Sequence, residues 1–162
     1  MYRTQATTGS GQILGTTTNN NAAAGYVGEF ITSTVASGSA VTLTTATTAN
    51  VTSISLTAGD WDVNGAVDYI FAATTSVTQL QAGVSLTSAT LAGQAGGAGL
   101  GTDPTVSLAQ PAAVPTALPY VQMIAPVRVS IAATTTVFLV SQAVFTVAAC
   151  TAFGTIRARR VR

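Results

Sequence analysis

The chain has no histidine and no lysine: its six cations are all arginines, set against five acidic residues in 162 positions. Charged residues make up 7% of the sequence, whereas about 25% is usual for a soluble domain. Without histidine and lysine, the chain lacks the commonest general base, the amine of Schiff-base chemistry and the cation of a P-loop. We therefore expect a protein that is not an enzyme and holds no cofactor. The net charge of +1 predicts no nucleic-acid partner.

Cys150 is the only cysteine, so it cannot form a disulfide within the chain. It follows Val147 and two alanines, which is typical of a small buried residue. An unpaired cysteine is compatible with synthesis in a reducing cytosol. Mean hydropathy is +0.48, but Thr, Ser, Gly or Pro interrupts every apolar run before the roughly 18 residues of a membrane span. Residues 1–12 also lack the apolar segment of a signal peptide, so we expect no membrane partner.

What the chain does have is threonine, at twenty-nine positions, together with abundant alanine, serine and glutamine. A surface of these residues does not repel its neighbours. It is typical of a subunit that packs against copies of itself or against a larger shell.

From Tyr26 onward the sequence predicts strands, because β-branched residues dominate and helix formers at 3.6-residue spacing are absent. The predicted strands are 26–35, 40–45, 50–57, 60–72, 76–87, 120–131, 135–148 and 151–161. Eight short strands are the number found in a jelly roll or a similar sandwich. The predicted fold class is therefore all-β, a jelly-roll-like antiparallel β-sandwich with an extended N-terminal arm.

The clearest strand is 60–72, which has one apolar and one polar face. The apolar face carries Trp61, Val63, Val67, Tyr69 and Phe71, and the polar face carries Asp60, Asp62, Asn64 and Asp68. Asn64 and Gly65 could form a two-residue hairpin turn, but that turn would mix polar and apolar residues on each face. We therefore predict a continuous strand in which Gly65 marks a bulge or a close approach.

The sequence divides into an arm, residues 1–25, and a β domain, residues 26–162. The arm has few large apolar residues, and we expect Tyr2, Ile13 and Leu14 to be its contacts with a neighbour. Residues 92–119 are rich in glycine and proline and are predicted to be a long loop. A loop of this length is usually functional or held by a neighbour.

Two short segments resemble each other, 72–77 (AATTSV) and 132–137 (AATTTV), each between two apolar strands. Both are predicted to be the same kind of hairpin connection. The strand after the second segment is apolar on both faces, so it should lie centrally in a sheet or be covered by another subunit. Val137 and Leu139 are therefore candidate interface residues, and a homotrimer is expected.

Two charged clusters are candidate sites. Asp60, Asp62 and Asp68 could bind a divalent cation, but their spacing along a strand favours a solvated face, so no metal site is predicted. Four arginines lie close together in the sequence: Arg157, Arg159, Arg160 and Arg162. We interpret them as interface residues that pair with carboxylates of a partner, since arginine favours fixed bidentate geometry. A solvated strand end and a phosphate contact are the alternatives.

Four stretches together carry a resemblance: 26–30 (YVGEF), 41–45 (VTLTT), 54–63 (ISLTAGDWDV) and 153–162 (FGTIRARRVR). Over about residues 26–162 the chain resembles small virion surface proteins of tailed bacteriophages and prophages, of the capsid decoration (cement) or fibre type. Its C-terminal half also looks like the trimeric jelly rolls of the tumour-necrosis-factor type. The resemblance offers no catalytic residues.

The resemblance implies a non-enzymatic capsid decoration protein, made in the bacterial cytoplasm and located on the capsid surface. Its partners would be two further copies of itself and the major capsid protein, and it would stabilise the head by bridging capsomers. The alternative is a tail-fibre or head-fibre module that recognises a saccharide of the host surface. The single tryptophan, which is predicted to lie in a core strand, argues against sugar stacking.

Overall fold

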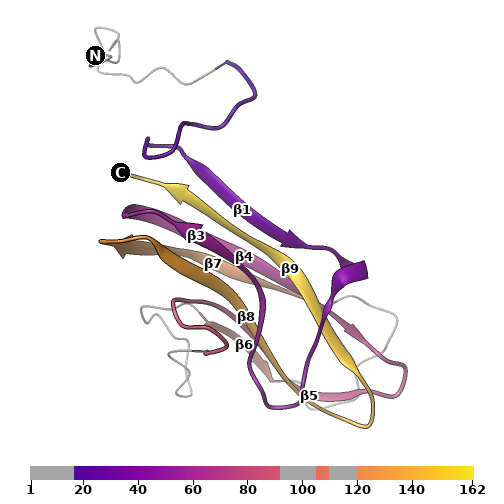
Figure 1. Cartoon of the computed structure of the whole chain (residues 1–162). Coiled ribbons are helices and arrows are strands. Elements are labelled where there is room, and N and C mark those ends of the chain that lie inside the picture. Colours follow the sequence, from indigo (N-terminus) through magenta and orange to yellow (C-terminus); the bar gives the residue numbers. More distant parts are fainter. Residues whose placement is uncertain (1–16, 92–104, 110–119) are drawn as a thin grey trace, which may run out of the picture.

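The valine- and threonine-rich segments form the strands of an antiparallel β-sandwich, as the sequence predicts. The computed structural model (Figure 1) describes residues 17–91, 105–109 and 120–162, the middle segment as backbone only. The strands are β1 Phe30–Val35, β2 Val41–Thr42, β3 Ala49–Leu56, β4 Gly59–Phe71, β5 Ser76–Ser85, β6 Thr105–Ala109, β7 Tyr120–Ile131, β8 Thr135–Thr146 and β9 Cys150–Arg160. A short 3₁₀ turn, Ser37–Ser39, separates β1 from β2.

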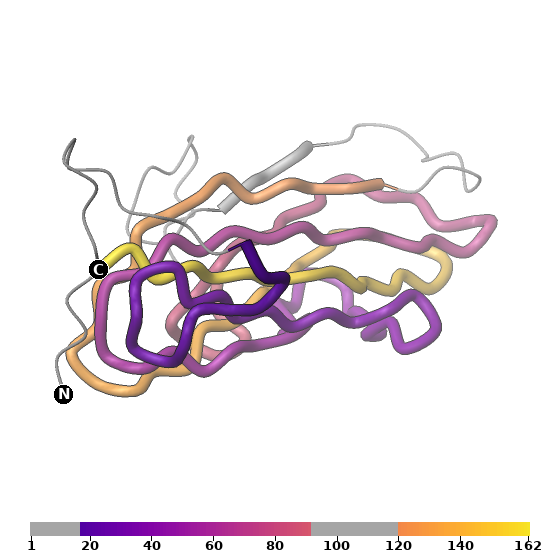
Figure 2. Tube along the Cα trace, turned by 90° about the horizontal axis from the view of Figure 1, so that it is seen from above, coloured from indigo at the N-terminus to yellow at the C-terminus, as the bar shows by residue number. Residues whose placement is uncertain are grey.

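Two sheets face each other. The first sheet has the order β1-β9-β4-β7, with β2 also pairing to β9, and the second has the order β3-β8-β5-β6. Four of the pairs are nested in the sequence: β1 with β9, β3 with β8, β4 with β7 and β5 with β6. The nested pairs form a long antiparallel ribbon that is rolled up, so that alternate pairs lie in opposite sheets. This topology is a jelly roll. Figure 2 shows the strands running lengthwise, with turns at both ends.

Most connections pass from one sheet to the other. The segments 72–75 and 132–134 join β4 to β5 and β7 to β8, and each therefore crosses from the first sheet to the second. The prediction that they are hairpin connections is wrong, because neither pair of strands is hydrogen-bonded. The two repeated segments are nevertheless equivalent corners of the roll.

The core lies between the sheets and includes the apolar face predicted for β4. Trp61, Val63, Val67 and Tyr69 are at most 1% exposed. β4 is continuous, and its pairing with β7 shifts register between Val63 and Gly65. A Cβ atom at Gly65 would lie 2.9 Å from the carbonyl oxygen of Thr155 and 3.0 Å from the Leu139 side chain. The bulge and the close approach are both confirmed.

β8 lies centrally, between β3 and β5, which explains why it is apolar on both faces. Val137 and Leu139 are fully buried in the core of the single chain. Their predicted interface role is therefore wrong, because side chains enclosed between the two sheets cannot reach another subunit. The expected trimer must rest on another surface.

The predicted long loop, residues 92–119, contains strand β6, which pairs with β5 at the edge of the second sheet. Glycine and proline around this five-residue strand obscured it. Within the predicted arm, the Asn21 amide donates to the carbonyl of Phe30 (2.7 Å) and accepts from its N–H (2.8 Å). Attachment to the β domain thus begins before residue 25. Tyr2, Ile13 and Leu14 lie outside the described residues.

Candidate interaction face

The outward side of the first sheet carries most of the charged residues that the structure describes. Along β4 the core residues alternate with outward ones, so Asp62, Ala66, Asp68 and Ile70 point away from the second sheet. Because β4 pairs with both β9 and β7, each of these residues has one neighbour on β9 and one on β7. We call this surface the outer face.

One end of the outer face is apolar. Ile70 is 46% exposed, Val121 51% and Met123 69%. Phe153, which is half-buried, lies opposite Asp68 on β9, and Val121 lies opposite the same residue on β7. Several large apolar side chains on one regular sheet surface are typical of a protein contact.

The other end of the outer face is charged. Asp62 lies opposite Arg159 on one side and Arg128 on the other. Opposite charges in register on adjacent strands attract one another. Arg157 is two residue pairs further along, opposite Asn64, and it is exposed like Arg159.

Asp60 is held by two arginines. The Nε atom of Arg128 lies 2.8 Å from one carboxylate oxygen, and the Nε atom of Arg162 lies 2.6 Å from the other. The hydrogen bond from Arg128 is the main cause that lowers the pKa of Asp60. It outweighs the effect of burial, and Arg162 adds to it. Asp60 is therefore an ion-pair residue of the fold, and Arg162 pairs with a carboxylate of its own chain and not with the predicted carboxylate of a partner.

Arg160 is buried, although the sequence predicts it at an interface. Its Nε atom lies 2.9 Å from a carboxylate oxygen of Glu29, and its two terminal nitrogens donate to the Ala58 carbonyl and the Thr57 hydroxyl. With every nitrogen of the guanidinium engaged, Arg160 cannot reach another subunit. The predicted interface role of Arg160 is wrong, and its guanidinium bonds three different groups of its own chain instead of making the predicted bidentate pair with a carboxylate.

Glu29 is the matching carboxylate from the segment before β1. Its burial alone would raise its pKa, but the N–H of Gly25 at 2.8 Å and the Arg160 guanidinium stabilise the ionised form, and the pKa is lowered. The ion pair between Glu29 and Arg160 therefore links the beginning of β1 to the end of β9.

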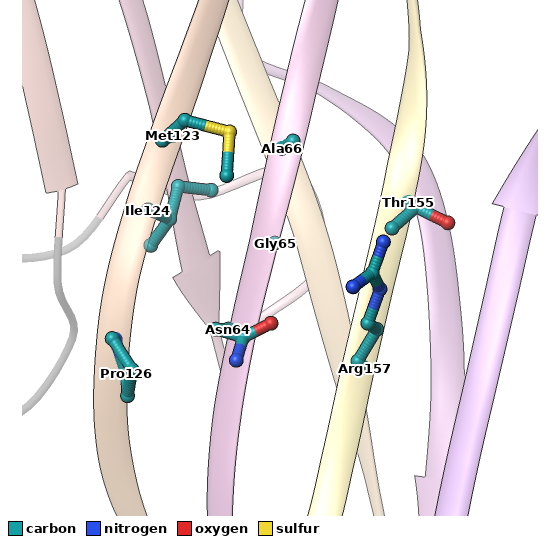
Figure 3. A pocket seen from close by; sticks show the side chains of 8 residues that line it. All are labelled: Asn64, Gly65, Ala66, Met123, Ile124, Pro126, Thr155 and Arg157. Atoms are coloured by element: carbon teal, nitrogen blue, oxygen red, sulfur yellow. The ribbon is translucent and has the colours of Figure 1, made fainter.

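A shallow hollow of about 220 Å³ opens on the outer face beside the β4 bulge (Figure 3). Met123, Ile124 and Pro126 of β7 form one side, and Thr155 and Arg157 of β9 form the other. In Figure 3 the Arg157 side chain runs along β9 toward Thr155. The hollow therefore joins the apolar and charged ends of the outer face.

Between the sheets lies a buried polar network that sequence reasoning missed. The Tyr69 hydroxyl is 2.9 Å from both the Gln81 carbonyl and Oε1 of Gln122, and it accepts a hydrogen bond of 2.8 Å from Ser141. With one hydrogen, it donates to one of its two acceptors at a time. Burial raises the pKa of Tyr69. Because the network joins strands of both sheets within the core, it orients them and presents no reactive group to solvent.

Sequence reasoning also missed the apolar end of the outer face. The signal is present: Ala66 and Ile70 occupy the predicted polar face of 60–72, and Val121 and Met123 alternate with a buried Gln122. Only the strand order shows that these two groups of residues, more than 50 positions apart in the sequence, share one surface.

Within the described residues, no group of three or more His, Cys, Asp or Glu side chains is placed to hold a metal ion. None of the helical segments in this part of the chain has the length and apolarity needed to cross a membrane. Comparison with protein-family models, with curated proteins and with solved structures gave no match.

Proposed function

We propose that the protein is a non-enzymatic structural protein of a bacteriophage virion, a homotrimer that decorates the outside of the capsid. The observation that carries the proposal is the apolar end of the outer face, where Ile70, Val121 and Met123 are exposed on one side of one sheet. The sequence resemblance to phage virion proteins supplies the setting. The low charge of the chain supports permanent packing against other subunits.

In this proposal the apolar end of the outer face is buried between subunits of the trimer. The trimer sits over junctions between capsomers, and the N-terminal residues reach the major capsid protein. Several weak contacts on one particle raise the effective concentration of each, so modest interfaces suffice to hold the trimer on the shell.

Sedimentation tests the trimer. The wild-type protein should sediment as one species near three times 16.2 kDa. Met123→Asp should dissociate it, because the exposed methionine lies on the apolar end. Leu86→Asp is the matched control, since Leu86 is 44% exposed and directly follows β5 of the second sheet. A trimer that survives Met123→Asp places the interface elsewhere.

Binding to stripped capsids tests the decoration role. A chain that lacks residues 1–16 keeps Asn21 and its bonds to Phe30, so it should fold and bind the shell more weakly than the full chain. The copy number in purified virions should approach that of the major capsid protein. A far smaller copy number, with binding of host saccharide, would favour the fibre alternative.

A further inference from the structure

Ion pairs and strand register together account for all but two of the charged residues that the structure describes. Glu29 pairs with Arg160, Asp60 pairs with Arg128 and Arg162, and Asp62 lies in register with Arg159. Among the described residues, Arg157 then has no carboxylate beside it and Asp68 has no cation. One charge of each sign therefore remains on the outer face.

These two residues lie on adjacent strands of the outer face, too far apart along the sheet to be paired neighbours. Arg157 is opposite Asn64, and Asp68 is opposite Phe153. Four residues along a strand correspond to about 13 Å. The Ala66–Thr155 pair lies between them, and no ion pair in the described part of the chain joins them.

Asp68 has apolar neighbours on both sides, Phe153 on β9 and Val121 on β7. Partial burial already raises its pKa in the single chain. If the apolar end is covered by another subunit, the Asp68 carboxylate is covered with it. A buried carboxylate without a cation strongly destabilises an interface, so the covering surface must bring a positive charge.

We propose that Arg157 of one subunit pairs with Asp68 of the next copy in the homotrimer. The inference rests on the proposed trimer and names the polar contact within it. The copy itself supplies the cation that the covered carboxylate requires, because Arg157 lies on the same face and its side chain extends along β9 (Figure 3). In a ring of three subunits, Arg157 of each subunit contacts one neighbour, and Asp68 of the same subunit contacts Arg157 of the other neighbour. Three equivalent ion pairs therefore form.

Charge reversal tests the pair. Asp68→Arg and Arg157→Asp should each raise the concentration at which the trimer half-dissociates by about 30-fold or more, since each puts like charges together. The double variant, Asp68→Arg with Arg157→Asp, should restore the wild-type value. Leu86→Arg adds a charge next to β5 of the second sheet and should change nothing. Thermal unfolding of each variant confirms that the subunit itself is folded.

The outcomes separate this inference from the proposed function. A monomeric wild type overturns both. A trimeric wild type whose single reversals stay trimeric, or whose double variant is not restored, overturns the ion pair alone.

Mixing the two single variants gives a further test of ring size. Two complementary subunits satisfy both contacts of a dimer, whereas a ring of three always contains one like-charged contact. Mixing should therefore restore assembly less well than the double variant does. Full restoration by mixing would overturn the three-membered ring in favour of a dimer.

Discussion

The guanidinium carbon of Arg160 lies 4.2 Å from the centroid of the Trp61 ring. A cation over an indole face is attracted by the negative potential of the ring. The contact joins the beginning of β4 to the end of β9, and the Trp61 indole N–H donates to the Thr57 carbonyl at 3.0 Å. The only tryptophan of the chain is thus a fully buried packing residue, with Arg160 over its ring and its indole N–H bonded.

Trp61→Ala should lower the free energy of unfolding by about 3–5 kcal/mol, because it removes a fully buried aromatic side chain and leaves a cavity. Trp61→Phe is the control, since it keeps an aromatic ring and should cost less. Chemical denaturation of both variants measures the difference. Unchanged stability with loss of saccharide binding would show instead that Trp61 is a ligand platform.

Arg160→Ala should destabilise the fold far more than Arg162→Ala does. The Arg160 side chain is 5% exposed, and its removal leaves the Glu29 carboxylate buried without its cation. The Arg162 side chain is 72% exposed, so its loss should change the free energy of unfolding by about 1 kcal/mol or less. Equal melting temperatures for the two variants would contradict this ranking.

The strands could be predicted because the alternation of apolar and polar residues along a segment depends on that segment alone. Trp61, Val63 and Val67 identify the core face of β4 without knowledge of any other strand. The exception is β6, since five residues among glycines and prolines give too short a pattern.

The interaction face depends instead on strand order, which the sequence does not state. Val137 and Leu139 have the same apolar pattern whether a second sheet or a second subunit covers them. Arg160 and Arg157 are three positions apart, yet one is turned toward Glu29 and Trp61 and the other toward solvent. Successive side chains of a strand alternate between its faces, so two residues three positions apart point in opposite directions. Only the packing of the two sheets shows that Arg160 is the one that points inward.

Stability should fall in acid because of Glu29 and Asp60. Both have lowered pKa values in the folded protein, so their contribution is complete above their ordinary pKa values of 4.5 and 3.8. It is lost as the pH falls through the lowered values. Asp68 acts in the opposite sense: its raised pKa favours the folded state below 3.8, and that contribution is lost as the pH rises through the raised value.

Urea denaturation at pH 7 and pH 3 measures the balance of these effects. The wild type should lose stability between the two pH values, and Glu29→Gln should lose less, because it has one fewer carboxylate to protonate. Asp68→Asn should lose more than the wild type does, since it lacks the opposing effect. Identical losses in all three proteins would show that the ion pairs do not control acid stability.

Cys150 should be inert to thiol reagents in the folded protein. Its side chain is fully buried in the core, where β9 begins beside Phe71, and burial raises the pKa of its thiol to about 12. The thiolate is the nucleophile, so at pH 8 both access and ionisation are suppressed. Labelling with iodoacetamide should be slow in buffer and fast in denaturant, with a rate in buffer that follows global unfolding.

Trp61→Ala tests whether labelling depends on global unfolding: the destabilised variant should label faster under native conditions. Rapid labelling of the wild type in buffer would mean that the β8–β9 corner opens without unfolding the sandwich.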